Sequence, residues 1–350
     1  MRLALTLPLI AVAAASAAAQ STETSTLAEV DNWIRARAAA DSFSGAVLVA
    51  RNGVPLLRAG YGLADRSRRI PVTPDTKFNL GSIDKLITRI AIWQLVATGK
   101  LDLDIPIGRY LPDYPNAAVR ERVTARHLYE MKSGVGNFMG DAYLQRHSEI
   151  RTVDQYLELF ANEPLQFEPG SAMLYSNGGY IILGKLIERL SERSYYDYVL
   201  ANITGPLSMV STRHYAIDED VPNRAIGYTA TRGPLQPNTY SLAGRGSPAG
   251  GGYSTVDDFL KLDGALRTGR LLPAGFDSVL APSFARGEPV SYGGGGPGTN
   301  THYASWADGT TIIVFGNLDP PATTQVAQRI AAALGKSLPG GTRVLRRPGA

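Results

Sequence analysis

Strand-like segments stand near both ends of this chain, and a long, mostly helical stretch separates them. Near the start, SGAVLVARNGVPLLRAGYG gives two β-type runs joined by Asn52-Gly53, a dipeptide typical of tight hairpin turns. Near the end, VSYGGGGPGTNTHYASWADGTTIIVFGNL gives short strands, two of which Asp308-Gly309 would join as a hairpin. We therefore expect an α/β (α+β) fold, in which an antiparallel sheet built from both ends of the chain is flanked by helices and carries an inserted, mostly helical lobe.

Helical patterns fill much of the remaining chain. STLAEVDNWIRARAAA predicts an amphipathic helix, and residues 82–99 predict an apolar helix closed by Gly99. GGYSTVDDFLKLDGALRTG begins as a capped helix, and TTQVAQRIAAAL follows the last strand as a final helix. We therefore predict an α/β lobe made of residues 20–100 and 251–335, and a mainly helical lobe made of residues 101–250.

The first residues have the layout of a secretory signal peptide. In MRLALTLPLIAVAAASAAAQ, Arg2 precedes an apolar run that ends in small alanines, with cleavage expected after Ala19. The alternative is an N-terminal membrane anchor, but the apolar run is short for a bilayer. We therefore predict a signal peptide at residues 1–19 and a mature protein that is periplasmic or secreted, without stable membrane insertion.

Composition excludes several classes of protein. The chain has 350 residues, of which 44% are hydrophobic and 19% charged, as in soluble globular proteins. It has no cysteine, and therefore neither a disulfide nor a thiol nucleophile. Its net charge of +4 comes from scattered basic residues and a basic tail at 336–350, without a nucleic-acid-binding motif. His127, His147, His214 and His302 lack metal-ligand spacing, so we expect no metal and no other cofactor.

The strongest chemical signal is Ser82 with Lys85, at the head of the apolar helix in FNLGSIDKLITRIAIWQLVATGKLDL. Positions i and i+3 of a helix share a face, so the two side chains come within reach of each other. A lysine in a poorly hydrated place can lose its proton and then activate a serine hydroxyl. The alternative interpretation is a helix-capping serine beside a surface lysine.

Two further motifs are candidates for a site. Tyr175-Ser176-Asn177 precedes a predicted helix, and these residue types can transfer a proton and hold a substrate amide. SYGGGGPGTN at 291–300 places four consecutive glycines in a strand pattern, which favours close approach of a ligand to backbone N–H groups. An ordinary loop with a capping asparagine, and a flexible glycine loop, are the structural alternatives.

Taken in this order, the three motifs resemble those of the serine β-lactamase and penicillin-binding-protein superfamily, in its class C β-lactamase-like branch. The resemblance extends over most of the chain after the predicted signal peptide, through stretches such as GKLDLDIPIGRYLPDYPN, VTARHLYEMKSGVGNF and GGGYSTVDDFLKL. It implies that Ser82 is the acylated nucleophile, Lys85 its partner, and Tyr175 a general base and then acid. It also implies that Asn177 contacts the substrate amide, and that backbone N–H groups of Ser82 and Gly295 form an oxyanion hole.

One position departs from the family pattern. The third motif of the family begins with Lys or His, a small residue and Gly, whereas this sequence has Tyr292-Gly293-Gly294. A lysine there offers a positive charge to the carboxylate of penicillins and D-Ala-D-Ala peptides, whereas a tyrosine offers one neutral hydrogen bond. Arg245 is a candidate to supply the missing charge. We expect Tyr292, Gly294 and Gly295 to contact substrate, and ester cleavage to be favoured over turnover of β-lactams.

These inferences predict an exported serine hydrolase that forms an acyl-enzyme on Ser82. Its expected substrates are small esters, or amides related to cell-wall peptides. Two alternatives stay open. One is a class C-like β-lactamase or D-alanyl-D-alanine carboxypeptidase, and the other is a non-catalytic protein that binds peptidoglycan or a protein partner. The intact Ser82, Lys85, Tyr175 and Asn177 argue against the non-catalytic alternative.

Overall fold

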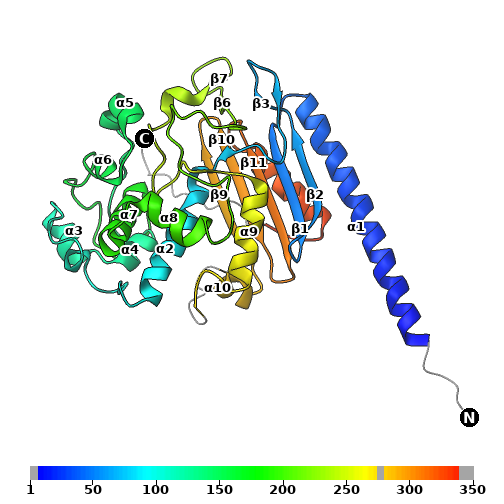
Figure 1. Cartoon of the computed structure of the whole chain (residues 1–350), viewed down its shortest axis with the longest axis horizontal. Helices are drawn as coiled ribbons and strands as arrows, with labels where there is room; N and C mark the ends of the chain where they lie inside the picture. Colours follow the sequence, from blue (N-terminus) through cyan, green and yellow to red (C-terminus); the bar gives the residue numbers. More distant parts are fainter. Residues whose placement is uncertain (1–6, 274–279, 339–350) are drawn as a thin grey trace, which may run out of the picture.

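The computed structural model describes residues 7–273 and 280–338 (Figure 1). A long N-terminal helix, a central sheet and a helical region succeed one another across the molecule. The predicted signal peptide at 1–19 and the predicted basic tail at 336–350 lie partly outside the described residues, so both stay predictions. Among the residues described, no helix combines the length and the apolar character needed to cross a membrane.

A five-stranded antiparallel sheet forms the centre of the fold, and its strands come from both ends of the chain. Their spatial order is β2-β1-β11-β10-β9 (Figure 1). The strands are β1 (Gly45–Arg51), β2 (Val54–Tyr61), β9 (Val290–Gly296), β10 (Thr299–Ser305) and β11 (Thr310–Gly316). The predicted α/β fold with an antiparallel sheet flanked by helices is therefore confirmed.

Both predicted hairpins are present. Between β1 and β2, Asn52 and Gly53 have φ angles of 51° and 78°, the left-handed values that a tight two-residue turn requires. Between β10 and β11, the Asp308 side chain accepts a hydrogen bond from the Thr310 N–H at 3.0 Å. The turn residues therefore help to set the register of the strands on both sides of the sheet.

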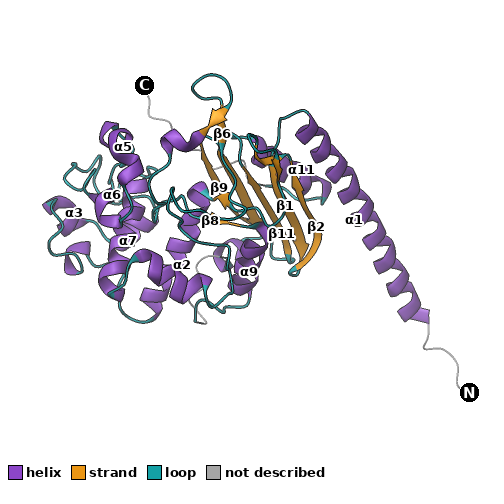
Figure 2. Ribbon diagram, turned by 45° about the horizontal axis from the view of Figure 1, so that its top comes forward, coloured by secondary structure: helices purple, strands orange, loops and turns teal. Residues whose placement is uncertain are grey.

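Helices cover both faces of the sheet (Figure 2). They are α1 (Leu7–Ala39), α9 (Val256–Arg267) and α11 (Ala322–Ala333). On the face covered by α1 and α11, Val47 and Val314 lie in a compact hydrophobic cluster. On the α9 face, Leu48 and Phe315 join the main hydrophobic core. Because successive residues of a strand point to opposite faces, β1 and β11 are apolar on both faces of the sheet.

The helical region lies beside the edge strand β9, and its helices pack around α7. Its helices are α2 (Lys85–Ala97), α3 (Ala117–Arg122), α4 (Ala125–Tyr129), α5 (Asp141–Arg146), α6 (Val153–Leu157), α7 (Asn177–Ser191) and α8 (Tyr195–Val199), and α10 (Ala281–Ala285) comes later in the chain. One continuous core joins α2, α7 and α9. The predicted division into lobes at 20–100, 101–250 and 251–335 stays a prediction.

Short strands and turns complete the fold. The strands pair as β3 with β4, β5 with β8 and β6 with β7. They are β3 (Leu63–Asp65), β4 (Ile70–Pro71), β5 (Phe78–Asn79), β6 (Tyr228–Thr229), β7 (Gln236–Pro237) and β8 (Tyr253–Ser254). The β5–β8 pair joins the segment just before Ser82 to the segment just before α9.

The helix predicted at 82–99 differs from the expectation at its start. Residues Gly81–Asp84 form a 3₁₀ turn, η1, and α2 begins only at Lys85. A 3₁₀ turn has three residues per turn, so side chains at i and i+3 lie almost directly above each other. The tighter winding therefore brings Ser82 and Lys85 into line more closely than an α-helix would.

A buried carboxylate fixes α9 to the sheet. Asp263 is 1% exposed and accepts hydrogen bonds from the hydroxyls of Tyr303 at 2.7 Å and Thr311 at 2.8 Å. It also forms an ion pair with Arg267 at 2.7 Å.

Asp263→Ala would leave these donors buried without their acceptor, so we expect the free energy of unfolding to fall by about 3–5 kcal/mol. Urea denaturation followed by circular dichroism measures the change. The control Asp263→Asn keeps an acceptor oxygen and should lose less, whereas equal losses in both variants would contradict this account.

Candidate active site

Three predicted catalytic side chains meet in the structure. The Ser82 hydroxyl lies 2.5 Å from the Tyr175 hydroxyl and 3.2 Å from Nζ of Lys85, which donates a hydrogen bond to it. Ser82 comes from η1, Lys85 begins α2, and Tyr175 ends the loop before α7. The cluster therefore depends on the docking of the α7 segment against η1, which brings together residues 93 positions apart.

Lys85 is buried, with its amine inside a set of oxygen acceptors. Its Nζ donates to the side-chain oxygen of Asn177 at 2.8 Å and to the carbonyl oxygen of Ala249. Only 4% of the residue is exposed. Burial lowers the pKa of Lys85 to about 7, although the neighbouring Asp84 carboxylate opposes this shift. A substantial fraction of the amine is therefore unprotonated near neutral pH.

The phenol ring of Tyr175 lies close to the amine of Lys85. Burial raises the pKa of Tyr175, and its hydrogen bond with Ser82 opposes that rise. The phenol therefore keeps its proton near neutral pH. Nζ of Lys85 lies 4.9 Å from the centre of the Tyr175 ring. A protonated phenol so close to the serine oxygen is suited to pass a proton on rather than to hold a standing negative charge.

Asn177 contacts the amine of Lys85 and also lines the cavity in front of Ser82. The preceding Ser176 caps α7 by accepting a hydrogen bond from the Gly179 N–H at 2.8 Å. Asn177 accepts from Lys85 through Oδ1 and donates through Nδ2 to Asn137 at 3.2 Å. Sequence reasoning missed Asn137, although it lies in the family-like stretch VTARHLYEMKSGVGNF.

The glycines of β9 lie directly against the serine. β9 is an edge strand of the sheet and runs beside η1. A Cβ atom on Gly294 would lie 2.3 Å from the Leu80 carbonyl oxygen and 3.0 Å from the backbone nitrogen of Ser82. A Cβ atom on Gly81 would lie 3.1 Å from the backbone nitrogen of Gly295. The predicted residues Gly294 and Gly295 therefore lie beside Ser82, where an added side chain would push the two segments apart.

Tyr292 does not lie where we expected it. Its side chain is absent from the cavity lining and packs against the main core, stacked on Tyr303 with ring centres 6.5 Å apart. Its neighbours include the guanidinium of Arg89, which opposes the rise that burial causes in the Tyr292 pKa. The predicted substrate contact by Tyr292 is therefore corrected. An aromatic ring gains more from stacking in the core than from facing an open cavity.

Arg245 does not supply the missing charge either. Its Nε donates to the carbonyl oxygen of His214 at 2.8 Å, and its guanidinium stacks over the Tyr196 ring at 3.7 Å. It is not among the residues that line the cavity. The cations that do line the cavity are Arg224 and Arg232, which sequence reasoning missed because both lie in irregular segments.

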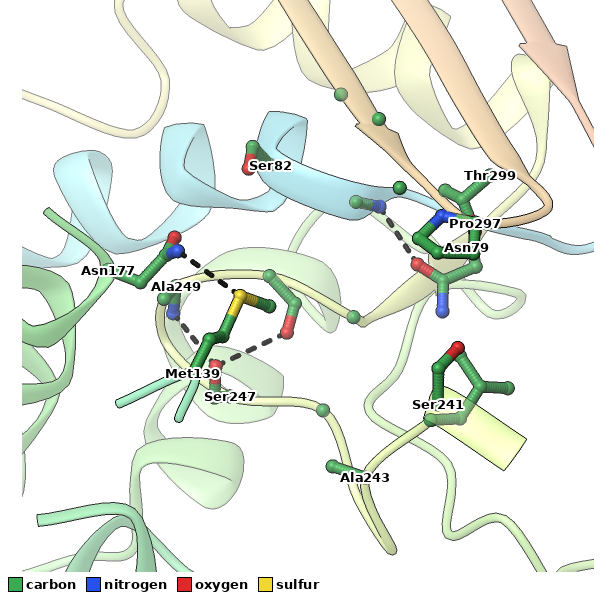
Figure 3. Close-up of a pocket in the computed structure, with 18 of the residues that line it drawn as sticks. Asn79, Ser82, Met139, Asn177, Ser241, Ala243, Ser247, Ala249, Pro297 and Thr299 are labelled. Carbon is green, nitrogen blue, oxygen red and sulfur yellow. Dashed lines mark hydrogen bonds between the residues drawn. The ribbon is translucent and has the colours of Figure 1, made fainter. Parts of the chain in front are cut away.

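A cavity of about 980 Å³ opens in front of Ser82. Apolar and aromatic side chains form much of its wall, including Phe138, Met139, Tyr143, Leu144, Tyr215 and Ile217. Figure 3 shows Asn177, Met139 and Ala249 on one side of Ser82, and Asn79, Pro297 and Thr299 on the other. Within the described part of the chain, no group of three or more His, Asp or Glu side chains is arranged to hold a metal ion.

Comparisons with known proteins give one consistent result. The model of the Beta-lactamase family matches residues 30–335. A penicillin-binding protein of Bacillus subtilis (strain 168) is 28% identical over 308 residues, which cover 78% of this chain and 67% of that protein. Esterase EstB of Burkholderia gladioli is 31% identical over 324 residues, which cover 81% of this chain and 78% of that protein. The crystal structure of a penicillin-binding protein from Bacillus halodurans gives a TM-score of 0.74 at 30% identity, covering 84% of this chain and 95% of the other.

The family match includes every element that forms the site. The sheet, η1, α2, α7 and the glycine-rich strand all lie inside the matched residues. The solved structure shares the fold over nearly all of its own length. The chain is therefore a serine hydrolase that belongs to the beta-lactamase family.

Proposed function

We propose that this protein hydrolyses small esters through an acyl-enzyme formed on Ser82. The observation that carries the proposal is the position of the Ser82 hydroxyl, which contacts both Tyr175 and Lys85 and faces the cavity. In the first step the serine oxygen bonds to the substrate carbonyl carbon, and the bond from that carbon to the leaving oxygen breaks. In the second step water attacks the acyl carbon and restores the serine.

Lys85 is the proposed base. Its amine is buried, is often unprotonated near pH 7, and hydrogen-bonds the serine oxygen. It takes the serine proton as the new bond forms, and Tyr175 passes a proton to the leaving oxygen. In the second step the attacking water gives a proton back to Tyr175, and Lys85 returns its proton to the serine oxygen as the bond from that oxygen to the acyl carbon breaks. This assigns the general-base step to the amine, whereas the family resemblance assigned it to Tyr175. The raised pKa of the Tyr175 phenol supports the assignment to Lys85.

Backbone N–H groups are proposed to stabilise the negative charge that develops on the substrate oxygen. The N–H groups of Ser82 and Gly295 are the candidates, since their segments touch at Gly294 and Gly81. Fixed backbone donors need little reorganisation during the reaction, and loss of one typically lowers the rate about 10²- to 10³-fold. Asn177 is proposed to hold Lys85 in place and to offer an amide to the substrate.

Three features favour esters as the substrates. The cavity wall is largely apolar, so it suits an acyl group without charge. Tyr292 gives no cation to a substrate carboxylate, because its phenol is neutral and its partly buried ring packs against the core. One of the relatives in the family is Esterase EstB. Amides related to cell-wall peptides fit the same acyl-transfer chemistry and form the second part of the proposed substrate class.

A β-lactamase or D-alanyl-D-alanine carboxypeptidase is the second candidate. It is favoured by Arg232, which lines the cavity with its guanidinium over the Tyr240 ring at 4.2 Å and could meet a substrate carboxylate. Export to the periplasm or the medium is proposed for either activity, supported by the signal-like residues 1–19. N-terminal sequencing of protein recovered outside the cytoplasm would test the cleavage after Ala19.

A panel of three substrates tests the proposal. Purified protein is assayed with a p-nitrophenyl ester, a chromogenic cephalosporin and a D-Ala-D-Ala peptide, each alongside the Ser82→Ala variant. Ester turnover that needs Ser82, with an acyl adduct on that residue by mass spectrometry, is the expected result. Dominant turnover of the cephalosporin or the peptide would support the second candidate instead. No turnover of any of the three substrates, with no adduct on Ser82, would favour a binding protein and contradict the proposal.

The rate should depend on pH through Lys85. The amine can accept the serine proton only in its unprotonated form, so kcat/KM for the ester should fall as pH falls below the Lys85 pKa of about 7. We expect a sigmoidal acidic limb with its midpoint close to that value. A stopped-flow series in constant-ionic-strength buffers measures it, with spontaneous ester hydrolysis subtracted at each pH. A flat profile through neutral pH would exclude Lys85 as the base.

A further inference from the structure

A buried carboxylate and a buried imidazole lie behind the catalytic cluster. Asp84 directly precedes Lys85 and is 0% exposed, and His214 is 5% exposed. Oδ2 of Asp84 lies 2.7 Å from Nε2 of His214 and accepts a hydrogen bond from the Gly252 N–H at 2.9 Å. Neither side chain touches the cavity. The proposed reaction uses neither residue, so this pair needs a separate explanation.

Among the described residues, one N–H group donates a hydrogen bond to the Asp84 carboxylate. Within the described residues, Oδ1 of Asp84 has no hydrogen-bond partner, and the contact with Nε2 of His214 is not aligned as a hydrogen bond. A buried carboxylate with one N–H donor stays ionised at high cost unless positive charge lies nearby. At 2.7 Å, the His214 imidazole is the side chain next to this carboxylate that is able to carry a positive charge.

Aromatic rings pack against the His214 side of the pair, and Glu188 accepts a hydrogen bond from the N–H of Tyr195 behind them. Tyr195 and Tyr196 of α8 contact the His214 ring with centres 5.4 Å away in each case. The cation on that side is Arg245, which stacks on Tyr196 and donates to the His214 carbonyl oxygen. This arrangement places the imidazole next to aromatic rings, and the Asp84 carboxylate lies 2.7 Å from its Nε2.

The surroundings of the lysine are equally well defined. The groups that face the Lys85 amine are the hydroxyl of Ser82, the phenol rings of Tyr175 and Tyr180, the amide of Asn177 and the Ala249 carbonyl. The next cation on α2 is Arg89, one turn further on, whose guanidinium lies over the Tyr129 ring at 3.9 Å. The Asp84 carboxylate opposes the lowering of the Lys85 pKa that burial causes. Because Asp84 directly precedes Lys85 and both side chains are buried, we expect a change in the charge of Asp84 to change the proton affinity of the amine.

We propose that Asp84 and His214 are positioning residues, which act through Lys85 by fixing how much negative charge lies beside its amine. The carboxylate attracts the proton of Lys85, and a positive charge on His214 would offset part of that attraction. The inference rests on the proposed role of Lys85 as the base. It predicts that the two residues tune the acidic limb of the reaction in opposite directions.

Two near-isosteric variants separate this role from a structural one. Asp84→Asn keeps an acceptor for the Gly252 N–H but removes the charge, so the acidic midpoint should move about one pH unit lower. His214→Asn keeps a polar side chain beside Asp84 but removes the group that can carry a positive charge there, so the midpoint should move about one pH unit higher. The measurement is the rate of Ser82 acylation by a p-nitrophenyl ester across pH, in the full-length chain.

Shifts of opposite sign would support the proposal, because loss of packing alone lowers the rate without moving the midpoint. Unmoved midpoints, or shifts of the same sign, would overturn it. If His214→Asn fails to fold in thermal melts, His214→Gln takes its place, and the sign of the Asp84→Asn shift alone still decides. A wild-type protein that shows no Ser82 acylation, or no acidic limb, would overturn the proposed function rather than this inference.

Discussion

Ser82→Ala is expected to lower kcat/KM for ester hydrolysis by at least about 10⁴-fold, because it removes the oxygen that carries the acyl group. The residual rate would come from substrate binding and backbone donors alone. The fold should be retained, since Lys85 keeps its contacts with Asn177 and Ala249. Initial rates with the p-nitrophenyl ester and intact-protein mass spectrometry after brief exposure measure the loss of turnover and of the acyl adduct.

Ser241→Ala is the matched control for this prediction. Ser241 also lines the cavity, but its hydroxyl donates to the carbonyl oxygen of Asn238 at 2.9 Å, and it forms no hydrogen bond with a lysine in the described part of the chain. Its loss should change the ester rate only slightly. Two serine variants with similar activity would show that another group forms the acyl-enzyme, and would remove Ser82 from the mechanism.

Gly294→Ala is expected to lower kcat/KM by about 10²- to 10³-fold, the effect of losing a backbone donor to the substrate oxygen. The added Cβ would lie 2.3 Å from the Leu80 carbonyl oxygen and 2.4 Å from the Thr301 hydroxyl. Backbone atoms cannot turn aside as a long side chain can, so β9 must move away from η1. The gap between the N–H groups of Ser82 and Gly295 would widen. Ester kinetics together with urea denaturation separate the loss of rate from the loss of stability.

Gly293→Ala provides the comparison for that substitution. A Cβ atom at Gly293 would meet nothing within 4 Å, and the residue is exposed on the same strand. The variant should therefore keep nearly the full rate and the same unfolding midpoint. If both glycine variants lose activity equally, strand flexibility rather than close contact with the serine segment would explain the glycines.

Local patterns were sufficient to predict the elements of the sheet and the serine–lysine pair. Asn52-Gly53 can adopt the left-handed values that a tight turn needs, so the first hairpin followed from two residues. The spacing of Ser82 and Lys85 placed their side chains together whether the turn was α or 3₁₀. Thr255 also caps α9 through a hydrogen bond from the Asp258 N–H, in the capped helix expected there.

Contacts between residues that lie far apart in the chain determine the features that the sequence could not predict. Tyr292 occupies the strand position at which the family pattern has a lysine or histidine, but its ring stacks on Tyr303 and does not face the cavity. The contact of His214 with Asp84 joins segments 130 residues apart, and neither residue belongs to a local motif. The cavity wall comes from irregular loops, whose backbone conformation no periodicity specifies. These features therefore become visible only in the three-dimensional structure.

The interleaving of early and late strands bears on how the protein is made. β1 has β2 on one side and β11 on the other, and β11 is translated only after all the helices from α2 to α10. Until then one flank of β1 exposes unpaired N–H and C=O groups, which invite pairing with other nascent polypeptides. Folds that depend on such distant pairing mature slowly. Because β9 must also reach η1 before the serine has its neighbours, we expect ribosome-bound or prematurely terminated chains to be inert, and hydrolysis to begin only after translation has passed the final strand.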